Sequence, residues 1–594
     1  MSELIKGGGF LLGPVDENTV FIPEDFDDIH LMIKKTSYDF MKNQVEPKLD
    51  QIEAMEEGVM TDLLRQAGEL GLLSSDIPEE YGGEEADMVT TNIIKECASL
   101  CGGSFATAFG AHTGIGTLPI VFFGTEEQKK KYLPGLATGE KIASYALTEP
   151  EAGSDALNCK TKAVLSDDGK HYILNGAKQY ITNAAWADVI VTYAKIDGER
   201  FTAFIVEADT DGVSIDPEEK KMGIKGSSTC SVILDNAKVP VENMLWEEGK
   251  GHQVAFNILN IGRFALGAGC LGGSKAVMEF ASDYALQRVQ FQQPIAQFNL
   301  IKNKFANMAI LTYVMESLVY RIGGMIDEKL DEVRDSGSEM SEIARAIHEY
   351  AIECSIAKVF CSEGMDKIAD EGVQILGGYG YGQEYPAERS YRDSRINRIF
   401  EGTNEVNRML IPGTLLRKAM KNELPFMESV MGLGGTLSKM KEAEIPEGTP
   451  EKEEFYLENM KTLFVLAAGN AAQKFGEDIT NEQEILSRLA DMAMEVFAAE
   501  SGLLRAKKMM AKEENEETKL AMSMTSCFIH EMVPKMEAWA KEIIAGTFGD
   551  GEEADKAYSG IRRLTLFEPI NTYGPKREIA EAVYQSKKYF LDRM

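Results

Sequence analysis

The sequence predicts a mainly α protein with a central antiparallel β domain. Apolar residues recur at spacings of three and four on both sides of residues 143–247, which is the period of an amphipathic helix. Within 143–247, β-branched or aromatic residues alternate with polar ones, and Asp-Gly and Asn-Gly pairs mark hairpin turns. In chain order, we predict an N-terminal segment and helical domain at 1–142, an antiparallel β domain at 143–247, a helical bundle domain at 248–431, a linker at 432–454 and a C-terminal helical domain at 455–594.

The first helical region begins near residue 26. The stretches LMIKKTSYDFMKNQV and TDLLRQAGELGLL each carry an apolar stripe at helical spacing. Pro78 and the glycines at 82 and 83 interrupt this pattern, because proline cannot continue a helix and glycine favours turns. We therefore expect a helical domain with a break near these residues.

Four turn signals divide the predicted β domain into strands. They fall within AVLSDDGKHYILNGAKQYITNAAWADVIVTYAKIDGERFTAFIVEADTDGVSI, which indicates an antiparallel arrangement. Helical periodicity returns near residue 252 and continues to about 420. The acidic stretch DEVRDSGSEM and the glycine-rich stretch GVQILGGYGYGQEYP interrupt it.

The segment GLGGTLSKMKEAEIPEGTPEKEE is small, charged and proline-containing, which is typical of a linker. Further helical patterns follow it, as in ENMKTLFVLAAGNAAQKFG and RLADMAMEVFAAESGLLRAKKMMA. Their apolar faces favour packing inside the protein over contact with a membrane.

Charge and composition exclude several classes of function. The chain has 594 residues, 95 of them acidic and 62 basic, with a formal net charge of -33, which opposes generic binding to nucleic acid or to an anionic membrane. A small anionic ligand remains compatible with this charge, because local N–H groups and arginines can bind it. The first residues lack a secretory leader pattern, and no apolar stretch of 18 residues is apparent, so we expect a cytoplasmic protein.

The cysteines and histidines indicate no metal site. Only Cys97 and Cys101 lie close together among the eight cysteines, and no second pair or histidine tract accompanies them. The six histidines form no HExxH pattern. We therefore expect reduced, buried thiols and no bound metal.

The stretch RINRIFEGTNEVNRML contains the first candidate catalytic residue, Glu401. Ile399 and Phe400 precede it, Gly402 allows a tight turn, and Thr403 or Asn404 can cap a following helix. One interpretation is that Glu401 is simply one solvated acid among 95. The other is a semi-buried carboxylate whose pKa is raised by desolvation, which suits a general base.

Two stretches of the β domain carry candidate ligand contacts. In YALTEPEAGSDA, Thr148 could hydrogen-bond the edge of a heterocycle, and Gly153 and Ser154 could let backbone donors approach a phosphate. In KQYITNAAW, Tyr180 and Thr182 lie on one face of a strand and could line a flat ring. An ordinary turn and ordinary strand packing explain the two patterns equally well.

The helical bundle contributes three weaker signals. The run GVQILGGYGYG is not a GxGxxG motif after a strand, so it gives little support for a Rossmann site, although its glycines permit close backbone approach. Arg263, Arg288 and Phe291 stand among apolar or small residues. Each is also compatible with ordinary helix packing.

Taken in order, these motifs resemble the acyl-CoA dehydrogenase family. The motifs are YALTEPEAGSDA, KQYITN, QRVQFQQPI and QILGGYGYGQEYPAERSYRDSRINRIFEGTNE, and the resemblance covers about residues 30 to 420. The form ILNIGRF and the additional C-terminal unit are most similar to the very-long-chain branch. The resemblance implies a helical domain, a β domain and a four-helix domain, followed here by a C-terminal helical domain.

The resemblance also implies an activity and its cofactor. Members use FAD to dehydrogenate acyl-CoA to trans-2-enoyl-CoA, the first step of fatty acid β-oxidation, and pass the electrons to an electron-transfer flavoprotein. Glu401 matches the catalytic base that removes the α-proton while the β-hydrogen passes to the flavin as hydride. Hydrogen bonds from the Glu401 N–H and a flavin hydroxyl would stabilise the thioester oxygen.

The family's binding residues can be placed on this sequence one by one. Tyr180 stands where many members have tryptophan, and Glu405 stands where some have glutamine, so Glu405 is left out of the predicted site. Arg288, Phe291, Gln374 and Gly378 correspond to residues with which a second subunit completes the FAD site, which implies at least a dimer. The predicted FAD contacts are Tyr145, Leu147, Thr148, Ser154, Tyr180, Thr182, Arg288, Phe291, Gln374, Gly378 and Thr403, and the predicted substrate contacts are Ser154, Arg263 and Gly402.

Substrate length, electron acceptor and the C-terminal unit leave alternatives open. Gly114 and Gly116 lie where the family builds its inner acyl pocket, which favours a long chain. An acyl-CoA oxidase that uses dioxygen and an inactive flavin- or CoA-binding scaffold are the competing functions. The basic tract at 562–578 could support peripheral membrane contact, or the C-terminal unit could instead shape a dimer.

Overall fold

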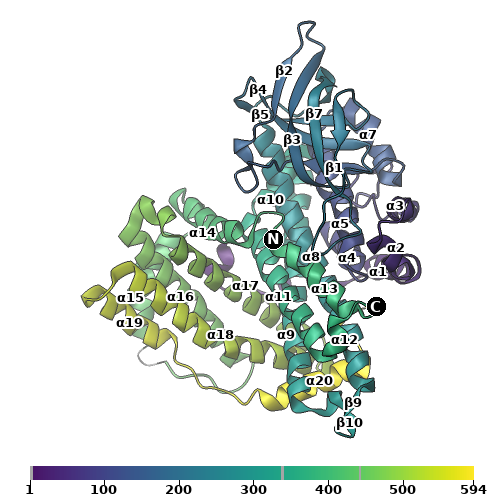
Figure 1. Cartoon of the computed structure of the whole chain (residues 1–594). Coiled ribbons are helices and arrows are strands. Elements are labelled where there is room, and N and C mark those ends of the chain that lie inside the picture. The colour runs from purple at the N-terminus through teal and green to yellow at the C-terminus, as the bar shows by residue number, and fades with distance from the viewer. Residues whose placement is uncertain (1–4, 336–339, 441–442, 594) are drawn as a thin grey trace.

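The computed structural model describes residues 5–335, 340–440 and 443–593. A β-sheet occupies one end of the molecule, long helices run away from it, and a further group of helices packs along their side (Figure 1). The predicted fold class, mainly helical with a central β domain and a C-terminal helical unit, is confirmed.

The N-terminal region is helical, as the apolar spacing predicts. A short π-helical turn, η7 (Ala111–Gly116), interrupts the run between α5 and α6. The main helices of the N-terminal region are α1 (Asp28–Phe40), α2 (Leu49–Glu53), α3 (Val59–Glu69), α4 (Met88–Ala98), α5 (Gly103–Gly110), α6 (Leu118–Phe123) and α7 (Glu126–Thr138).

The sheet follows directly after α7. Its strands are β1 (Ala143–Ala146), β2 (Lys162–Leu165), β3 (His171–Thr182), β4 (Val189–Ile196), β5 (Arg200–Glu207), β6 (Val213–Ile215), β7 (Thr229–Pro240) and β8 (Met244–Leu245). They pair in the order β6-β7-β3-β2-β4-β5-β8, with β1 on β4. The prediction of a purely antiparallel sheet needs one correction, because β1 and β2 both run parallel to β4. Turn signals reveal only hairpins, whereas these parallel pairings join strands that are not consecutive.

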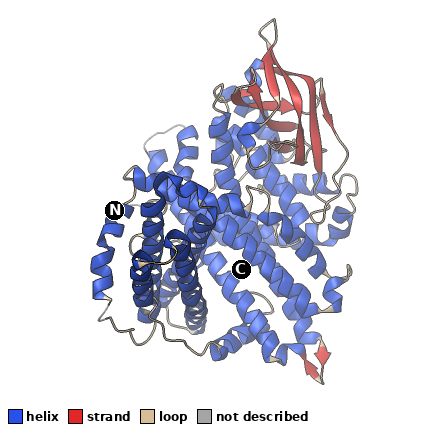
Figure 2. Ribbon diagram, turned by 60° about the vertical axis from the view of Figure 1, so that its left-hand side comes forward, coloured by secondary structure: helices blue, strands red, loops and turns tan. Residues whose placement is uncertain are grey.

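Long helices form the middle of the molecule. In chain order they are α8 (Gly251–Gln287), the hairpin strands β9 (Val289–Gln290) and β10 (Gln293–Pro294), α9 (Asn299–Asp335), α10 (Met340–His348), α11 (Ala351–Leu376), α12 (Gly378–Tyr381), α13 (Pro386–Ser394) and α14 (Asn404–Met420). α8 and α11 pack against each other, and α9 packs against both. The β9–β10 hairpin lies at the end of the molecule opposite the sheet (Figures 1 and 2).

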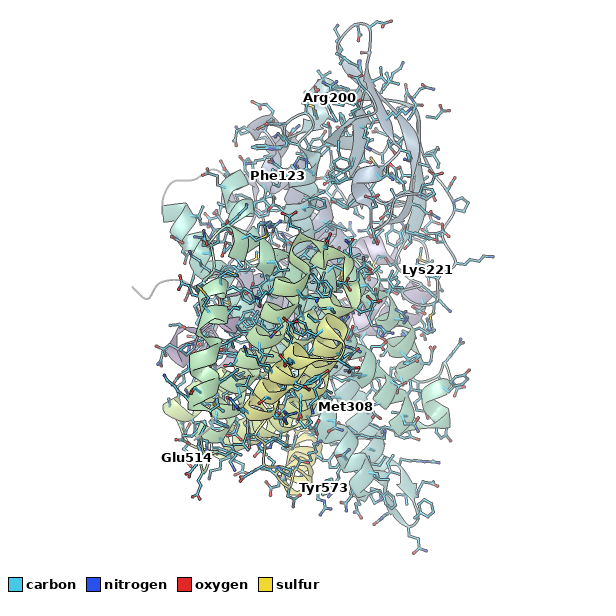
Figure 3. The ribbon with its side chains drawn as sticks, turned by 90° about the vertical axis from the view of Figure 1, so that its left-hand side faces the viewer. Phe123, Arg200, Lys221, Met308, Glu514 and Tyr573 are labelled. Carbon is cyan, nitrogen blue, oxygen red and sulfur yellow. The ribbon has the colours of Figure 1, made fainter. Side chains whose placement is uncertain are left out.

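The C-terminal unit consists of α15 (Phe426–Lys439), α16 (Glu451–Phe475), α17 (Gln483–Lys512), α18 (Glu516–Phe548), α19 (Glu552–Leu564) and α20 (Tyr573–Ser586). Figure 3 shows these helices lying along the side of the central helices. α17 packs on both α9 and α14, and α20 packs on α9. One continuous hydrophobic core therefore joins the unit to the rest of the protein.

The predicted linker at 432–454 is wrong at both ends, because α15 reaches Lys439 and α16 begins at Glu451; residues 441–442 lie outside the described residues. Residues up to Lys439 belong to α15, whose Val430 approaches Gly469 on α16 and whose Leu437 approaches Gly560 on α19. Apolar contacts with these two helices outweigh the low helix propensity of the local glycines.

Three helical stretches are long and apolar enough to cross a membrane by length and composition alone: Gly103–Phe123, Gly251–Gln287 and Asn299–Arg334. This corrects the expectation that no apolar stretch reaches that length. Most of each apolar window is buried inside the protein. Their apolar character is therefore explained by packing in the core. All eight cysteines are free and buried, as predicted.

Candidate functional site

A strained turn between Phe400 and α14 presents Glu401. The φ of Glu401 is +58°, which is costly for a residue with a side chain, and the φ of Gly402 is +77°. The Thr403 hydroxyl then accepts a hydrogen bond from the Val406 N–H at 3.3 Å and caps α14. The local order of residues thus turns the chain sharply and begins a helix at once.

Glu401 is half-buried, and one of its carboxylate oxygens is withdrawn from solvent. Its Oε2 atom has no hydrogen-bond partner among the described residues. A Cβ atom added at Gly262 of α8 would lie 2.6 Å from this oxygen, so only glycine at that position lets the helix and the carboxylate approach so closely. Burial raises the pKa of Glu401 to about 7, although Arg263 and Lys358 oppose the shift. The carboxylate can therefore exchange a proton near neutral pH.

Two cations support the turn from behind. The buried Arg263 donates from Nε to the Glu401 carbonyl at 3.3 Å and from Nη1 to Asn260 Oδ1 at 2.8 Å. Lys358 donates from Nζ to the Gly402 carbonyl at 2.8 Å and to Asn404 Oδ1 at 2.6 Å. Burial lowers the pKa of Lys358 to about 8. Both side chains therefore hold the backbone of the turn while their charges act on Glu401.

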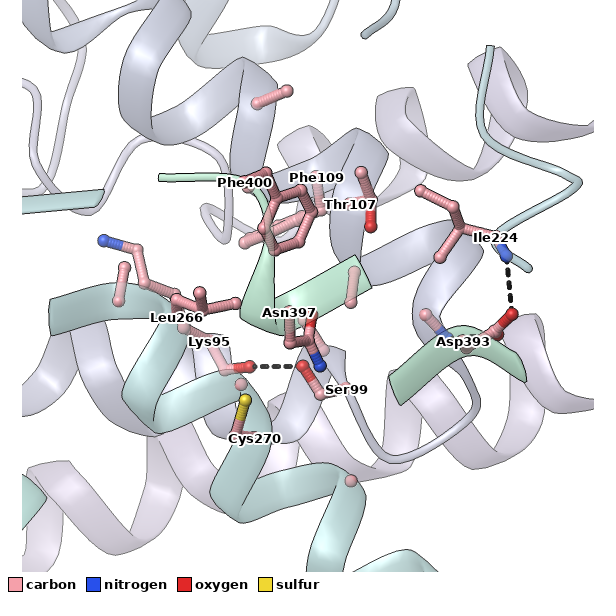
Figure 4. Close-up of a pocket in the computed structure, with 18 of the residues that line it drawn as sticks. Lys95, Ser99, Thr107, Phe109, Ile224, Leu266, Cys270, Asp393, Asn397 and Phe400 are labelled. Atoms are coloured by element: carbon pink, nitrogen blue, oxygen red, sulfur yellow. Dashed lines mark hydrogen bonds between the residues drawn. The ribbon is translucent and has the colours of Figure 1, made fainter. Parts of the chain in front are cut away.

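Glu401 lies at a cavity of about 170 Å³ between α5, η7, α8 and α13. Figure 4 shows its neighbour Phe400 in this cavity, with Phe109 and Leu266. Phe400 and Thr182 line it beside Glu401, and its walls are otherwise mostly apolar. Along α8 it is lined from Ile261 to Ala276, and the part beyond Gly262 alone corresponds to about 21 Å of helix at 1.5 Å per residue. The cavity suits an elongated apolar ligand.

The glycines predicted to shape this cavity divide in two. Gly114 lines it, and a Cβ atom added there would meet open space. Gly116 does not open it, because an added Cβ would lie 2.7 Å from the Ala143 Cβ atom. The prediction for Gly116 is therefore wrong, since this glycine serves the packing of η7 on β1.

The sheet contributes the next group of predicted residues. Tyr145 and Leu147 are buried, and the Tyr145 hydroxyl has no hydrogen-bond partner among the described residues. Thr148 is half-buried and Ser154 is exposed. The register of β3 on β7 shifts between Lys178 and Ile181, where Tyr180 has a φ of +58° and is 59% exposed. This end of the sheet therefore combines an open aromatic face with unpaired polar groups.

A second group of predicted residues lies far from the first. Arg288 and Gly378 line a separate cavity of about 470 Å³. The elements next to it, β9 and α12, lie toward the end of the molecule opposite the sheet (Figure 1). The Arg288 guanidinium lies 5.4 Å from the centre of the Tyr379 ring. Gln374 is exposed, and Phe291 is 88% exposed with a φ of +51°. Within one chain, these residues and the sheet residues form two separate sites.

Sequence reasoning missed Gly262, Lys358 and Asn407. Asn407 donates from Nδ2 to the Gly402 carbonyl at 2.9 Å. For Gly262 and Lys358 no local pattern gives a signal, because their role comes only from the packing of α8 and α11 around the turn. Asn407 carried a weak signal, since a polar residue one helical turn after Thr403 can reach back to the turn.

Four protein-family models match successive stretches of the chain. Models described as the N-terminal, middle and C-terminal domains of acyl-CoA dehydrogenase match residues 27–140, 144–237 and 249–416. A further model, also described as an acyl-CoA dehydrogenase C-terminal domain, matches residues 459–563.

Two curated relatives and one solved structure show the extent of the similarity. A probable acyl-CoA dehydrogenase of Bacillus subtilis is 51% identical over 589 residues and is covered to 99%, as is this chain. The very long-chain specific acyl-CoA dehydrogenase of Bos taurus mitochondria is 37% identical over 494 residues, which cover 78% of this chain and 72% of that protein. The crystal structure of an acyl-CoA dehydrogenase complexed with FAD from Bacillus anthracis is 50% identical, with a TM-score of 0.96 over 98% of this chain and 100% of that one.

Proposed function

The chain belongs to the acyl-CoA dehydrogenase family, and from this premise we propose that it uses FAD to dehydrogenate long-chain acyl-CoA to trans-2-enoyl-CoA. The observation that carries the proposal is the half-buried Glu401 at an elongated apolar cavity, with one shielded carboxylate oxygen that no described residue hydrogen-bonds. Such a carboxylate is suited to removing a proton from carbon in a site from which water is excluded.

The sheet residues fit a bound FAD. The open face of Tyr180 suits a flat ring, and the Thr182 side chain, which lines the cavity that also contains Glu401, offers a polar partner to its edge. Ser154 is exposed beside a glycine, where a phosphate could approach the backbone. When bound, FAD supplies the acceptor for the hydride that leaves the β-carbon.

The protein's own residues perform the proton chemistry. Glu401 removes the α-proton in its ionised form, so the reaction requires a pH near or above its pKa of about 7. Arg263 and Lys358 hold the backbone of the turn and limit how far burial raises that pKa. The apolar walls keep water from solvating the carboxylate.

The depth of the cavity supports a long acyl chain. It follows α8 over about 21 Å of helix, and Gly114 leaves part of it open. A butyryl group would fill only a small part of that length. The bovine relative named above is described as specific for very long chains, which agrees in direction.

The remaining parts of the proposal concern partners and location. We propose a dimer, because the resemblance places Arg288, Phe291, Gln374 and Gly378 at the same FAD as the sheet residues, whereas within one chain Arg288 and Gly378 line a cavity that none of those sheet residues lines. An electron-transfer flavoprotein is the proposed electron acceptor, since the relatives are named dehydrogenases. A cytoplasmic location fits eight free thiols, which a reducing compartment maintains. Peripheral membrane contact through residues 562–578 remains part of the proposal.

The visible spectrum of the purified protein tests the cofactor and the chemistry together. Without oxygen, palmitoyl-CoA should bleach the flavin band, and butyryl-CoA should do so more slowly. A colourless protein, or a flavin band that palmitoyl-CoA leaves unchanged, would contradict the proposal. Admitting air to the reduced protein then separates dehydrogenase from oxidase, because rapid release of hydrogen peroxide would identify an oxidase.

A further inference from the structure

We propose that the C-terminal helical unit positions the catalytic turn through Arg408, which joins Asp491 of α17 to Glu363 and Asn404 behind Glu401. The inference rests on the proposed function only in calling Glu401 the catalytic base. The contact itself is a property of the folded chain. α14, which carries Arg408, lies beside α17 (Figure 1).

The network begins at Asn404, the first residue of α14. This buried amide accepts a hydrogen bond from Lys358 Nζ at 2.6 Å and donates from Nδ2 to Glu363 Oε1 at 3.0 Å. The same Lys358 ammonium donates to the Gly402 carbonyl at 2.8 Å. Asn404 therefore fixes the direction of the lysine that holds the turn and acts on Glu401.

Arg408 extends the network by one helical turn. Its Nη1 and Nη2 atoms donate to the two oxygens of Glu363 at 2.7 and 3.0 Å. Its Nε atom donates to Asp491 Oδ1 at 2.8 Å. The planar guanidinium thus bridges two carboxylates from two helices, which an ammonium group cannot reproduce.

Shielding from solvent strengthens the ion pair between Arg408 and Asp491. The side chains of Arg408 and Asp491 are mostly shielded from solvent, so their interaction is weakly screened and each charge depends on its partner. Arg408 and Asn404 also keep the pKa of Glu363 below its usual range despite the burial of that carboxyl. Removing Asp491 would free one side of the guanidinium, and the disturbance would pass to Glu363 and then to Asn404.

The outer end of the same cluster supplies a control. Asp491 also accepts a hydrogen bond from Arg488 Nη1 at 3.1 Å, and Arg488 donates to Glu542 Oε2 at 2.9 Å. Glu542 is exposed, so its ion pair should contribute little. Both acids lie on the C-terminal unit, but only Asp491 contacts Arg408.

The test uses the full chain loaded with FAD and palmitoyl-CoA as substrate. Asp491→Asn keeps the shape and removes the charge, Arg408→Lys keeps the charge and removes the fork, and Glu542→Gln is the control. We expect kcat to fall about fivefold to tenfold in the first two variants, with KM within about twofold, and no change in the control. Wild-type kcat in both Asp491→Asn and Arg408→Lys, or an equal loss in Glu542→Gln, would overturn the proposal.

Hydrogen exchange supplies a readout that needs no turnover. The peptide spanning residues 399–407 should exchange faster in Asp491→Asn than in the wild type, and at the wild-type rate in Glu542→Gln. Faster exchange in a protein that does not oxidise acyl-CoA would support the positioning contact and reject the proposed function. Unchanged exchange would reject the contact whatever the activity. If Asp491→Asn does not fold, Arg408→Lys decides both measurements.

A double-variant comparison tests the route. Asn404→Ser removes the inner end of the network, so adding Asp491→Asn to it should cost little further kcat if the signal passes through Asn404. Losses that multiply would show that Asp491 acts by another route and would overturn the assignment.

Discussion

Glu401 and the cluster around Lys275 are two solutions to burying a carboxylate. At Glu401 one carboxylate faces a cavity with one oxygen unpaired, and burial raises its pKa to about 7. In the cluster, Lys275 Nζ contacts Glu96 at 2.7 Å, Glu316 at 2.5 Å and Asp592 at 2.9 Å. Despite burial there, Lys275 and its neighbouring cations hold the pKa of Glu316 and of Asp592 below the usual range.

The difference separates a reactive carboxylate from structural ones. Paired carboxylates stay ionised over the working range of pH and connect parts of the fold. An incompletely paired one changes protonation near neutral pH and can accept a proton from a substrate. Burial alone does not distinguish the two sites, because both withdraw carboxylate oxygens from solvent. The number of cations near each carboxylate, and their distance from it, distinguish the two sites.

The largest expected effect tests the reactive side of this comparison. Glu401→Gln keeps the shape but cannot accept a proton, so kcat on palmitoyl-CoA should fall by at least about 10³-fold. The variant should remain folded and yellow, as circular dichroism and the visible spectrum can check. Glu428→Gln, an exposed acid on α15, serves as the control and should keep full activity. Normal turnover by Glu401→Gln would remove Glu401 from its assigned role.

The structural side should respond in stability. Lys275→Met leaves three carboxylates, two buried and one half-buried, within 4.8 Å of one another without the cation that contacts all three. We expect a loss of about 3–5 kcal/mol in the free energy of unfolding, measured with urea. Lys329→Met removes a partly exposed pair with Glu332 and should cost less than about 1 kcal/mol. Equal costs for the two variants would show that the cluster contributes no more than a surface pair.

The pH dependence of stability sharpens the contrast further. Because the folded-state pKa of Glu401 is raised from 4.5 to about 7, its contribution lowers the free energy of unfolding as the pH rises from about 4.5 to about 7, and the loss stays constant above that. Glu401→Gln should therefore gain of the order of 3 kcal/mol on the wild type at pH 8.5, and less than about 1 kcal/mol at pH 5. Asp592 has the opposite sign, since its stabilising contribution is lost only as the pH falls through its lowered pKa. Urea unfolding at the two pH values checks this, and a gap that does not vary with pH would contradict it.

The smallest expected effect concerns space rather than charge. Gly114→Leu should enter the cavity and lower kcat/KM for palmitoyl-CoA by about tenfold, with a smaller change for butyryl-CoA. Gly272, beside the ionic cluster, has no such room, because an added Cβ would lie 1.9 Å from the Glu96 carbonyl oxygen. Gly272→Ala should therefore reduce stability, by about 1–3 kcal/mol, and leave chain-length preference unchanged. An unchanged preference in Gly114→Leu would show that this part of the cavity does not hold the acyl chain.

Periodicity and turns predicted the fold class, because they report local structure. They did not reveal the parallel pairing of β1 with β4, which joins strands separated by β2 and β3. Nor did they predict α15, where contacts with α16 and α19 outweigh glycine. Both failures concern contacts between segments that are distant in sequence.

The candidate site divides in the same way. Glu401, Gly402 and Thr403 are adjacent in sequence, so their order predicted the turn and the helix cap that the structure shows. Lys358 and Gly262 come from two other helices, and nothing near them marks their relation to Glu401. The pKa of Glu401 depends on those helices and could not be predicted from its own neighbours.

The position of Asp592 in the sequence determines when, during synthesis, the ionic cluster around Lys275 can form. The Asp592 carboxylate reaches Lys34 at 2.6 Å and Lys275 at 2.9 Å, so this ionic cluster includes a residue made 558 positions after Lys34. At about 5–20 residues per second, synthesis takes roughly half a minute to two minutes to cover that interval. The ion pairs of this cluster are therefore complete only after synthesis has reached residue 592.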